Sequence, residues 1–584
     1  TQLHFWTLTG HPDLLVTLFA YRPKDPRLWW AEWYQEQERR TPGTHPGLFP
    51  ILSPHELSWA PGETQTIDIV PAPDHAGRFM EFVLIDDVAE RIVARRRFNY
   101  QLPVTHLTVE AADWPTGLYR AIVVPSGAAV DPAVRNFNEK IQTLIVRPRR
   151  ATGTVLFVAP TDMWRAYASN GRHAMTSWRD DYHYTSVGYS PTVLNTRYRR
   201  TNHYYYGLYE RYSDIQHYRY LRELARKEGF QIDYCTQDDI ALDRVRLSDY
   251  RLVLVGSHAE FTTAECYFRF RDYMARGGAV MLHGGDSFAV MVEYLPGLRD
   301  RRYIWQRDHI WCHLTDQPDS FLPPQILPSV QAGSAIDYLN LFHVTLTYWP
   351  AGSRAVVFNT DHPIMRGLGL KAGDPIPGVW AGEADVTYEP RAWNILLRSD
   401  RAVTEPMESG LERTTQPAFY HTALMVHKNL RLAVISGESF TNLLSDPKCT
   451  LFQELYRRTL HYLLDSAVEL RDADAVEPKG SVAGAEFAWD APLVLKAIQY
   501  RLPDFIRYDD PLWFRKPAPY AHYVVEGSRD GATWTVLADR THGPWRGMQT
   551  DFFPAAELRT IRLRGVFSNG EPFRVRQVKV FHAQ

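Results

Sequence analysis

The ten residues from Arg251 to Glu260 place the strongest constraint on what this chain can fold into. They read Arg-Leu-Val-Leu-Val-Gly-Ser-His-Ala-Glu, so a short apolar, partly β-branched run is followed at once by Gly256 and polar residues. Such a run is typical of a strand that is buried on both faces of a parallel sheet. In open sheets of this kind, ligands bind beyond the carboxyl ends of the strands. We therefore expect a functional site directly after Gly256.

Two polar side chains follow this strand, His258 and Glu260. Residues two apart in extended backbone point to the same side, so a base and a carboxylate would lie next to each other. The alternative is the start of a helix, because Thr262 or Thr263 could cap the amphipathic segment that follows. The helix start accounts for the threonines and Glu265, but it leaves the histidine and Glu260 without a role.

The composition limits the class of protein. At roughly 100–200 residues per domain, a chain of 584 residues is expected to hold three or four domains. A net charge of −2 gives no basic surface for nucleic acid, and no apolar run approaches the roughly 18 residues of a membrane span. The four scattered cysteines form neither a disulfide framework nor a zinc motif. We expect a cytoplasmic homo-oligomer that binds neither nucleic acid nor membrane.

Strand and helix patterns divide the chain into three predicted domains. Short alternating segments predict an immunoglobulin-like β-sandwich over residues 1–150 and a second β-sandwich over residues 485–584. Over residues 151–470, short apolar strands alternate with amphipathic helices, which is typical of α/β proteins. We predict that this middle domain is a doubly wound parallel sheet of the class I amidotransferase or flavodoxin type, and that it carries the site.

Three common kinds of site lack their motifs. A dinucleotide site needs a glycine-rich first turn, but the strand at 154–158 runs into Ala159-Pro160-Thr161. The sequence has no Gly-x-Ser-x-Gly elbow for a serine nucleophile. It also has no His-Glu-x-x-His or paired Cys-x-x-Cys motif for zinc.

Tyrosine is the unusual residue of this chain. The segment from Tyr182 to Tyr220 holds eleven of the 32 tyrosines. A phenol is normally neutral, but next to a trivalent cation it loses its proton and becomes a hard oxygen ligand. Two phenolates and one carboxylate would neutralise Fe³⁺. The alternative is that these tyrosines fill a wet, half-buried interface, which is their commonest use.

Several motifs together resemble one known family. Residues from about 113 to 465 resemble the large subunit of N,N-dimethylformamidase and related proteins. The pairing of Ser-His-x-Glu with a later Gly-Gly-Asp is the most specific part of this resemblance. The segments that carry it are residues 113–119, 164–170, 187–190, 256–260, 284–286 and 434–439.

The resemblance implies a mononuclear non-haem Fe³⁺ that serves as Lewis acid and water activator in the hydrolysis of a small amide, at a C–N bond other than a peptide bond. The ligands that it implies are Tyr167, Tyr189 and Glu260, with Tyr182 or Tyr184 as alternatives to Tyr189.

Two further residues receive roles from the same resemblance. His258 would be the base beside the metal. Asp286 stands where the family pattern has asparagine, and it would anchor the substrate or the water. The formamidase also works with a small companion subunit.

A second resemblance concerns the C-terminal domain. The turn from Ser528 to Trp534, Ser-x-Asp-Gly-x-Thr-Trp, is similar to one in galactose-binding-like, or discoidin-type, β-sandwiches. It implies a glycan as a candidate ligand of this domain.

Two other functions are compatible with the sequence. One is a non-catalytic protein with a degenerate α/β core that binds a carbohydrate or a partner through the C-terminal domain. The other is a zinc- or manganese-dependent hydrolase that uses the same Glu260 and His258.

Overall fold

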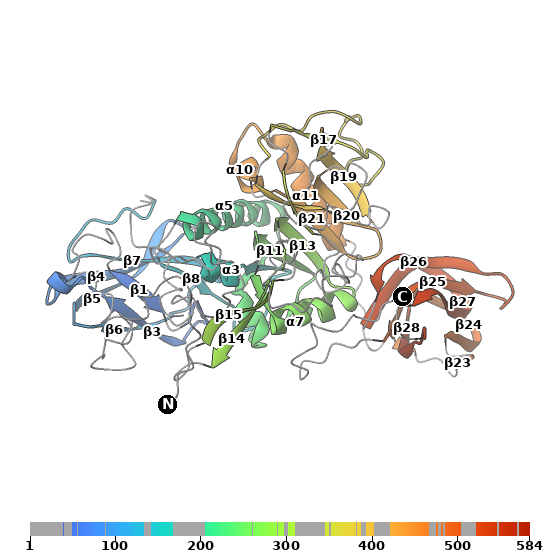
Figure 1. Ribbon diagram of the computed structural model, residues 1–584, viewed down its shortest axis with the longest axis horizontal. Coiled ribbons are helices and arrows are strands. Elements are labelled where there is room, and N and C mark those ends of the chain that lie inside the picture. Colours follow the sequence, from blue (N-terminus) through green and yellow to red (C-terminus); the bar gives the residue numbers. More distant parts are fainter. Residues whose placement is uncertain are drawn as a thin grey trace, which may run out of the picture. The chain divides into compact units, whose positions relative to one another are not determined.

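The structure is a computed structural model of the chain, which divides into two compact units (Figure 1). Unit 1 comprises Thr1–Val245, Phe261–Ala264 and Met291–Arg307, and unit 2 comprises Arg246–Glu260, Glu265–Val290 and Asp308–Gln584. The residues that the structure describes are 35, 39, 50–54, 56–87, 89–133, 142–167, 205–259, 261–285, 287–288, 290–296, 302–309, 345–349, 352–380, 382–386, 393–401, 421–437, 439–465, 475–476, 481–482, 485–503, 521–545, 548–568 and 572–583.

Unit 1 begins with two sheets that share one core. The first has the order β1-β3-β6 and the second the order β2-β8-β7-β4-β5. Their inward residues include Trp59, Ile67, Phe82 and Tyr119, all of them buried. The bounds are β1 (Ile51–Pro54), β2 (Ser58–Trp59), β3 (Thr64–Val70), β4 (Phe79–Asp86), β5 (Arg91–Asn99), β6 (Thr105–Glu110), β7 (Gly117–Pro125) and β8 (Gln142–Val146), with a short 3-10 helix at Pro73–His75.

The rest of unit 1 is a parallel strand pair with its helices. β9 (Val155–Ala159) and β10 (Ile232–Thr236) pair in parallel, and β9 is an apolar run of the kind that the sequence predicts. A small sheet pairs three further strands in the order β12-β14-β15. The remaining elements are α3 (Thr161–Tyr167), α5 (Tyr205–Glu228), α6 (Gln237–Ala241), β12 (Phe261–Thr263), β14 (Val290–Pro296) and β15 (Arg302–His309).

Unit 2 contains the strand predicted at Arg251–Glu260. Its strands follow the order β11-β13-β21-β20-β19-β17. β11, β13 and β21 pair in parallel, whereas β20, β19 and β17 pair antiparallel (Figure 1). Their bounds are β11 (Leu252–Ser257), β13 (Ala279–Gly284), β17 (Ala355–Val357), β19 (Trp393–Ser399), β20 (Thr422–His427) and β21 (Leu432–Ser436).

Helices accompany these strands. α11 contacts β13 and β21 and buries an apolar stripe that includes Leu455, Tyr456 and Leu463. The amphipathic segment that Thr262 or Thr263 was expected to cap becomes helical only at Ala264, because both threonines belong to the strand β12. The bounds in unit 2 are η3 (Leu247–Asp249), α7 (Ala264–Ala275), α10 (Phe440–Ser445) and α11 (Thr450–Asp465), with the strand pair β16 (Thr345–Tyr348) and β18 (Glu383–Val386).

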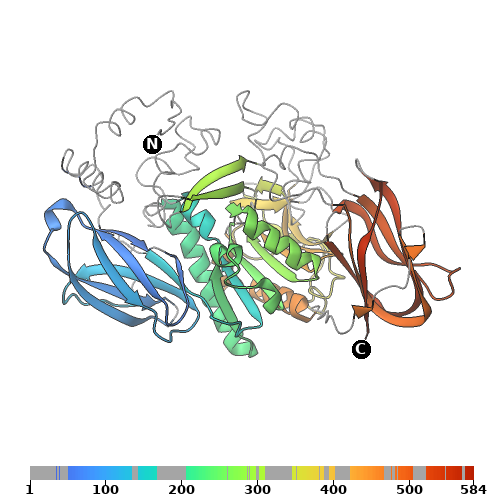
Figure 2. The ribbon, with the colours of Figure 1, turned by 90° about the horizontal axis from the view of Figure 1, so that it is seen from below.

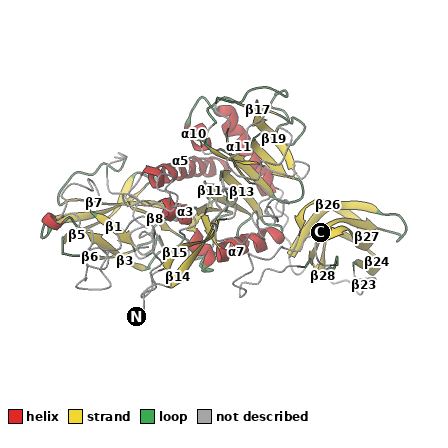
Figure 3. Cartoon of the chain, viewed as in Figure 1, coloured by secondary structure: helices red, strands yellow, loops and turns green. Residues whose placement is uncertain are grey.

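The predicted fold class was wrong. Strand is the predominant structure of the described residues (Figure 3), and they hold no doubly wound parallel core of the flavodoxin type. The reason lies in one connection. Only four residues join β20 to β21, and a parallel connection needs a dozen or more. The two strands must therefore form a hairpin, whose backbone N–H groups at Asn429 and Leu430 both donate to His427 Nδ1.

The end of unit 2 is a further antiparallel sheet with its own core. Its order is β22-β28-β24-β27-β25-β26, and β23 also pairs with β24. Figure 2 draws this sheet in red. The turn from Ser528 to Trp534 joins β25 and β26 as a hairpin, with Gly531 at φ +79°. The bounds are β22 (Ala475–Val476), β23 (Ser481–Val482), β24 (Glu486–Arg501), β25 (Ala521–Ser528), β26 (Thr535–Trp545), β27 (Met548–Ser568) and β28 (Arg576–His582).

This C-terminal sheet is fastened to α7 and to the β20–β21 hairpin. The Phe552 ring lies under the Arg431 guanidinium, 4.3 Å from Cζ to the ring centroid, and against Gly277. Asn429 Nδ2 donates to the carbonyl of Asp539 at 2.7 Å.

The three predicted domains, 1–150, 151–470 and 485–584, stay a prediction. No helix in the described part of the chain is long and apolar enough to cross a membrane.

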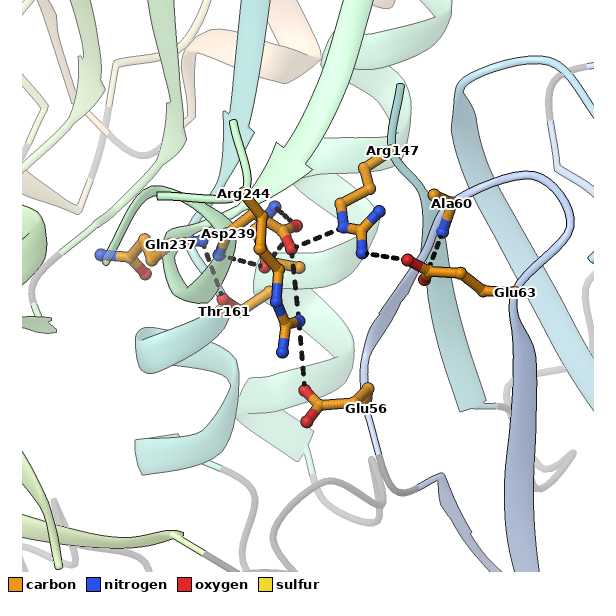
Figure 4. Close-up of polar contacts among 9 residues, drawn as sticks. Glu56, Ala60, Glu63, Arg147, Thr161, Gln237, Asp239 and Arg244 are labelled. Carbon is orange, nitrogen blue, oxygen red and sulfur yellow. Dashed lines mark hydrogen bonds and ion pairs between the residues drawn. The ribbon is translucent and has the colours of Figure 1, made fainter. Parts of the chain in front are cut away.

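A buried ion pair ties β8 to the start of α6 within unit 1 (Figure 4). Arg147 Nε lies 3.1 Å from Asp239 Oδ1, and its Nη2 lies 2.7 Å from Glu63 Oε1. Asp239 also closes a capping box with Thr236, which satisfies the first backbone N–H groups of α6. Arg244 is more exposed and lies 3.6 Å from the same carboxylate.

Arg147→Ala should lower the free energy of unfolding by about 3 kcal/mol, because it leaves the buried Asp239 carboxylate without its closest cation. The matched change Arg244→Ala should lower it by no more than about 1 kcal/mol, since that cation is partly exposed. Urea denaturation measures both values. Equal losses in the two variants would contradict the ranking.

Candidate functional site

Three parallel strands of unit 2 end side by side. Ser257 of β11 is level with His283 of β13, and Gly284 of β13 is level with Ser436 of β21. Parallel strands place their carboxyl ends at one edge of the sheet. The described residues that follow the three strands, His258 among them, therefore lie at this edge.

His258 follows the first of these strands directly. Its side chain is buried, with 2% exposed, and its backbone N–H donates to the carbonyl of His283 at 3.0 Å. Its φ of +53° lies in the left-handed region, which few residues other than glycine adopt. Such a conformation persists only where the surrounding structure enforces it, and it is commonest at functional sites.

Gly284 is the neighbour that leaves room for this geometry. Its φ is +88°, and a Cβ at this position would lie 2.6 Å from the backbone nitrogen of His258. Only glycine allows both the left-handed backbone and the close approach. Gly284, the first glycine of the Gly-Gly-Asp segment, thus allows the backbone of the predicted base His258 to pack directly against β13.

His283 is buried behind the same strand ends. Its Nδ1 lies 2.7 Å from the carbonyl oxygen of Val255, and its Nε2 lies 3.2 Å from the hydroxyl of Tyr456. Burial lowers the pKa of this imidazole to about 3, although the bond to Val255 opposes the shift. His283 is therefore neutral at physiological pH, and hydrogen bonds engage both of its ring nitrogens.

The two acidic positions of the predicted site, Glu260 and Asp286, lie outside the described residues, and their near neighbours are joined. The backbone N–H of Phe288 donates to the carbonyl of Ala259 at 2.8 Å. Both of these residues are buried, and the Phe288 ring packs edge-on against Phe270. The segments that lead to the two carboxylates are thus anchored to each other.

The candidate ligand Tyr167 is the last residue of α3 in unit 1, and its side chain lies outside the described part. The start of α3 is fixed by buried polar contacts with α6. Gln237 accepts a hydrogen bond from the backbone N–H of Asp162 at 2.9 Å, and its own N–H points to the Thr161 hydroxyl at 3.3 Å (Figure 4). α3 also contacts β12, the strand that begins directly after Glu260.

The metal set itself draws on residues that the structure does not describe. Tyr189 and its alternatives Tyr182 and Tyr184 lie outside the described residues. Within the described ranges, no group of three His, Cys, Asp or Glu side chains could hold a metal ion. The expected set of two tyrosines and Glu260 is of a different composition. It supplies three negative oxygen donors, which suit Fe³⁺.

His421 lies at the same edge of the sheet, and the sequence pattern did not point to it. It directly precedes β20, which runs antiparallel to β21, so it lies at the edge where β21 ends. Its side chain is buried, and burial lowers its pKa to about 4. The buried run Thr-Ala-Leu-Met-Val after His421 was the signal for this strand.

Comparison with known proteins gives one family and one structural likeness. The family described as "N,N-dimethylformamidase beta subunit-like, C-terminal" matches residues 100–439. No curated protein matches. Among solved structures, the chain is similar to chitosan-binding module 1, derived from a chitosanase/glucanase of Paenibacillus sp. IK-5, at 17% sequence identity and a TM-score of 0.13. This likeness covers 16% of the chain and 65% of the module.

Gly284→Ala should lower the free energy of unfolding by about 3 kcal/mol or more, because strain at positive φ adds to a clash with His258. Gly373→Ala is the matched control, since Gly373 has φ +92° and open space where a Cβ would lie. It should lower the free energy by only about 1 kcal/mol. Urea denaturation compares the two variants. If Gly284→Ala were as stable as Gly373→Ala, Gly284 would not be in close contact with the His258 backbone.

Acid should destabilise the fold through His283. Its folded pKa of about 3 lies below the unfolded value of about 6.5, so the unfolded chain binds one more proton between these pH values. Stability from this group is complete above pH 6.5 and is lost as the pH falls, by about 1.4 kcal/mol per unit. The free energy of unfolding, measured in urea, should fall as the pH is lowered from 6.5 to 5. His283→Asn should reduce the slope of this dependence by about one bound proton. An unchanged slope would mean that His283 is not buried in its neutral form.

Proposed function

This chain belongs to the family of N,N-dimethylformamidase beta subunit-like proteins, and we propose from this premise that it is an amidohydrolase. Its substrate is a small amide, cleaved at a C–N bond other than a peptide bond. The matched residues, 100–439, make up more than half of the chain. They include all three parallel strand ends and His258.

The observation that carries the proposal is the burial and backbone conformation of His258. A buried imidazole follows a buried strand in a left-handed conformation, and Gly284 of the neighbouring strand packs against its backbone. General-base catalysis needs a basic group that is held at a fixed position. Histidine is a common general base, and the carboxyl edge of parallel strands holds this one in place.

We propose Fe³⁺ as the cofactor, held by Tyr167, Tyr189 and Glu260. The contact between α3 and β12 supports this set, because it joins the segment that ends at Tyr167 to the one that starts after Glu260. Two phenolates and a carboxylate match the charge of the ion. When bound, Fe³⁺ would supply Lewis acidity toward the amide oxygen and lower the pKa of water.

The side chains of the chain move the protons. His258 takes one proton from the attacking water as the water oxygen forms its bond to the carbonyl carbon. It then gives this proton to the nitrogen as the C–N bond breaks, so the amine leaves neutral. The Asp286 carboxylate accepts a hydrogen bond from the substrate or the water and orients it. This sequence yields a carboxylic acid and an amine.

Metal analysis together with a screen of small amides tests the proposal. The concentrated protein should contain about one iron per chain and be visibly coloured by phenolate charge transfer. Tyr167→Phe and Tyr189→Phe should each bleach or shift the colour. Tyr462→Phe, on α11, is the matched control and should leave the colour unchanged. Full colour in either ligand variant would mean that another tyrosine, such as Tyr182 or Tyr184, binds the metal.

Two further variants distinguish the proposed base, His258, from the proposed metal ligand Glu260. His258→Gln should lower kcat by about 10²–10⁴-fold while the iron is retained. Glu260→Gln should lose iron and activity together. A colourless, metal-free protein that hydrolyses no amide would refute the proposed enzyme. Zinc or manganese in the active protein would replace Fe³⁺ and keep the roles of Glu260 and His258.

A further inference from the structure

We propose that His283 is a positioning residue, which clamps the end of β11 and thereby fixes the proposed base His258. Its catalytic consequence rests on the proposed function, whereas the clamp itself rests on contacts among described residues. His283 lies on β13, one strand away, and it grips β11 both through its backbone and through its imidazole ring.

The ring closes a gap that a bulge opens in the strand pairing. Between Leu254 and Ser257 the register of β11 against β13 shifts, so that β11 has one residue more than its partner. A bulge leaves backbone groups without their usual ladder partners. Val255 lies in this bulge, and its carbonyl oxygen accepts from His283 Nδ1 at 2.7 Å. The carbonyl of His283 in turn accepts from the backbone N–H of His258 at 3.0 Å.

Nε2 and the two faces of the His283 ring also have partners. A carbonyl oxygen can only accept, so the hydrogen bond to Val255 places the proton on Nδ1. Nε2 is then an acceptor for the Tyr456 hydroxyl, 3.2 Å away on α11. The ring stacks on Phe440 and on Tyr456, with centroids 5.1 Å and 5.6 Å apart. One tautomer in one orientation satisfies all of these contacts.

This clamp matters because His258 sits in a conformation that it would not keep alone. Its backbone is left-handed, and Gly284 of β13 lies so close to it that a Cβ at position 284 would clash with the His258 nitrogen. Without the bonds from His283, the end of β11 can relax toward extended backbone, and the imidazole of His258 then moves. A displacement of about 1 Å in a catalytic group can lower a rate by about 10²-fold.

Variants at position 283 test the clamp in the full-length protein. His283→Leu removes the donor to Val255 and should lower kcat by about 10- to 100-fold, with KM changed less than about threefold. His283→Asn can still donate from its amide near the position of Nδ1, and it should keep kcat within about fivefold. Tyr456→Phe is the milder change, should His283→Leu fold poorly, and it should fall between the two.

A buried histidine elsewhere provides the control. His427 ends β20 at the opposite edge of the sheet, where its Nδ1 accepts two backbone N–H groups of the hairpin. His427→Leu should lower the stability of the fold but leave kcat within about twofold. An equal loss of kcat in the His427 and His283 variants would reduce His283 to a general stabilising residue and overturn the inference.

A double-mutant comparison shows whether His283 acts through His258. In a His258→Gln background, His283→Leu should cause no further loss of kcat, because the group that it positions is gone. A further loss of 10-fold or more would overturn the inference.

Hydrogen exchange gives a readout that needs no activity. Amide exchange of the peptide from Leu252 to Thr263 should be faster in His283→Leu and near wild type in His283→Asn. If the wild-type protein hydrolyses no amide while this exchange pattern holds, the proposed function fails and the clamp stands. Unchanged exchange in His283→Leu overturns the clamp itself.

Discussion

The hydrogen-bonded register of β11, β13 and β21 is the constraint on which the site depends. Because Ser257 is level with His283, and Gly284 with Ser436, three strand ends open on one edge. Each strand is buried on both faces, so a slip by one residue would misfit closely packed side chains on both sides of the sheet. Hydrophobic burial therefore fixes the position of His258 before any contact of its own is made.

Local pattern predicted the strands well and their arrangement poorly. The apolar runs at β9 and β11 were recognised, since buried strands read as short continuous apolar segments. The all-parallel sheet was wrong because its last strands, β20, β19 and β17, lay in a stretch without a regular pattern. The short hairpin from His427 to Leu432 decides their direction, and it can be interpreted only once β20 is recognised.

The candidate site was predictable where chemistry and strand end coincide in sequence. His258 follows a buried strand after Gly256, and both the pattern and the family resemblance pointed to it. His283 and Tyr456 received no role, because their link crosses 173 positions of sequence and depends on how α11 packs. Contacts between elements distant in the chain leave no local signature.

The C-terminal sheet is fastened at the end of the strands opposite the site. Arg431 and Gly277 stand just before β21 and β13, and both meet Phe552 of the C-terminal sheet. A six-residue strand such as β13 spans about 20 Å, so this joint and the His258 edge are separated by the length of the sheet. Sequence drift at the joint can therefore alter how well the protein withstands heat while leaving substrate preference untouched.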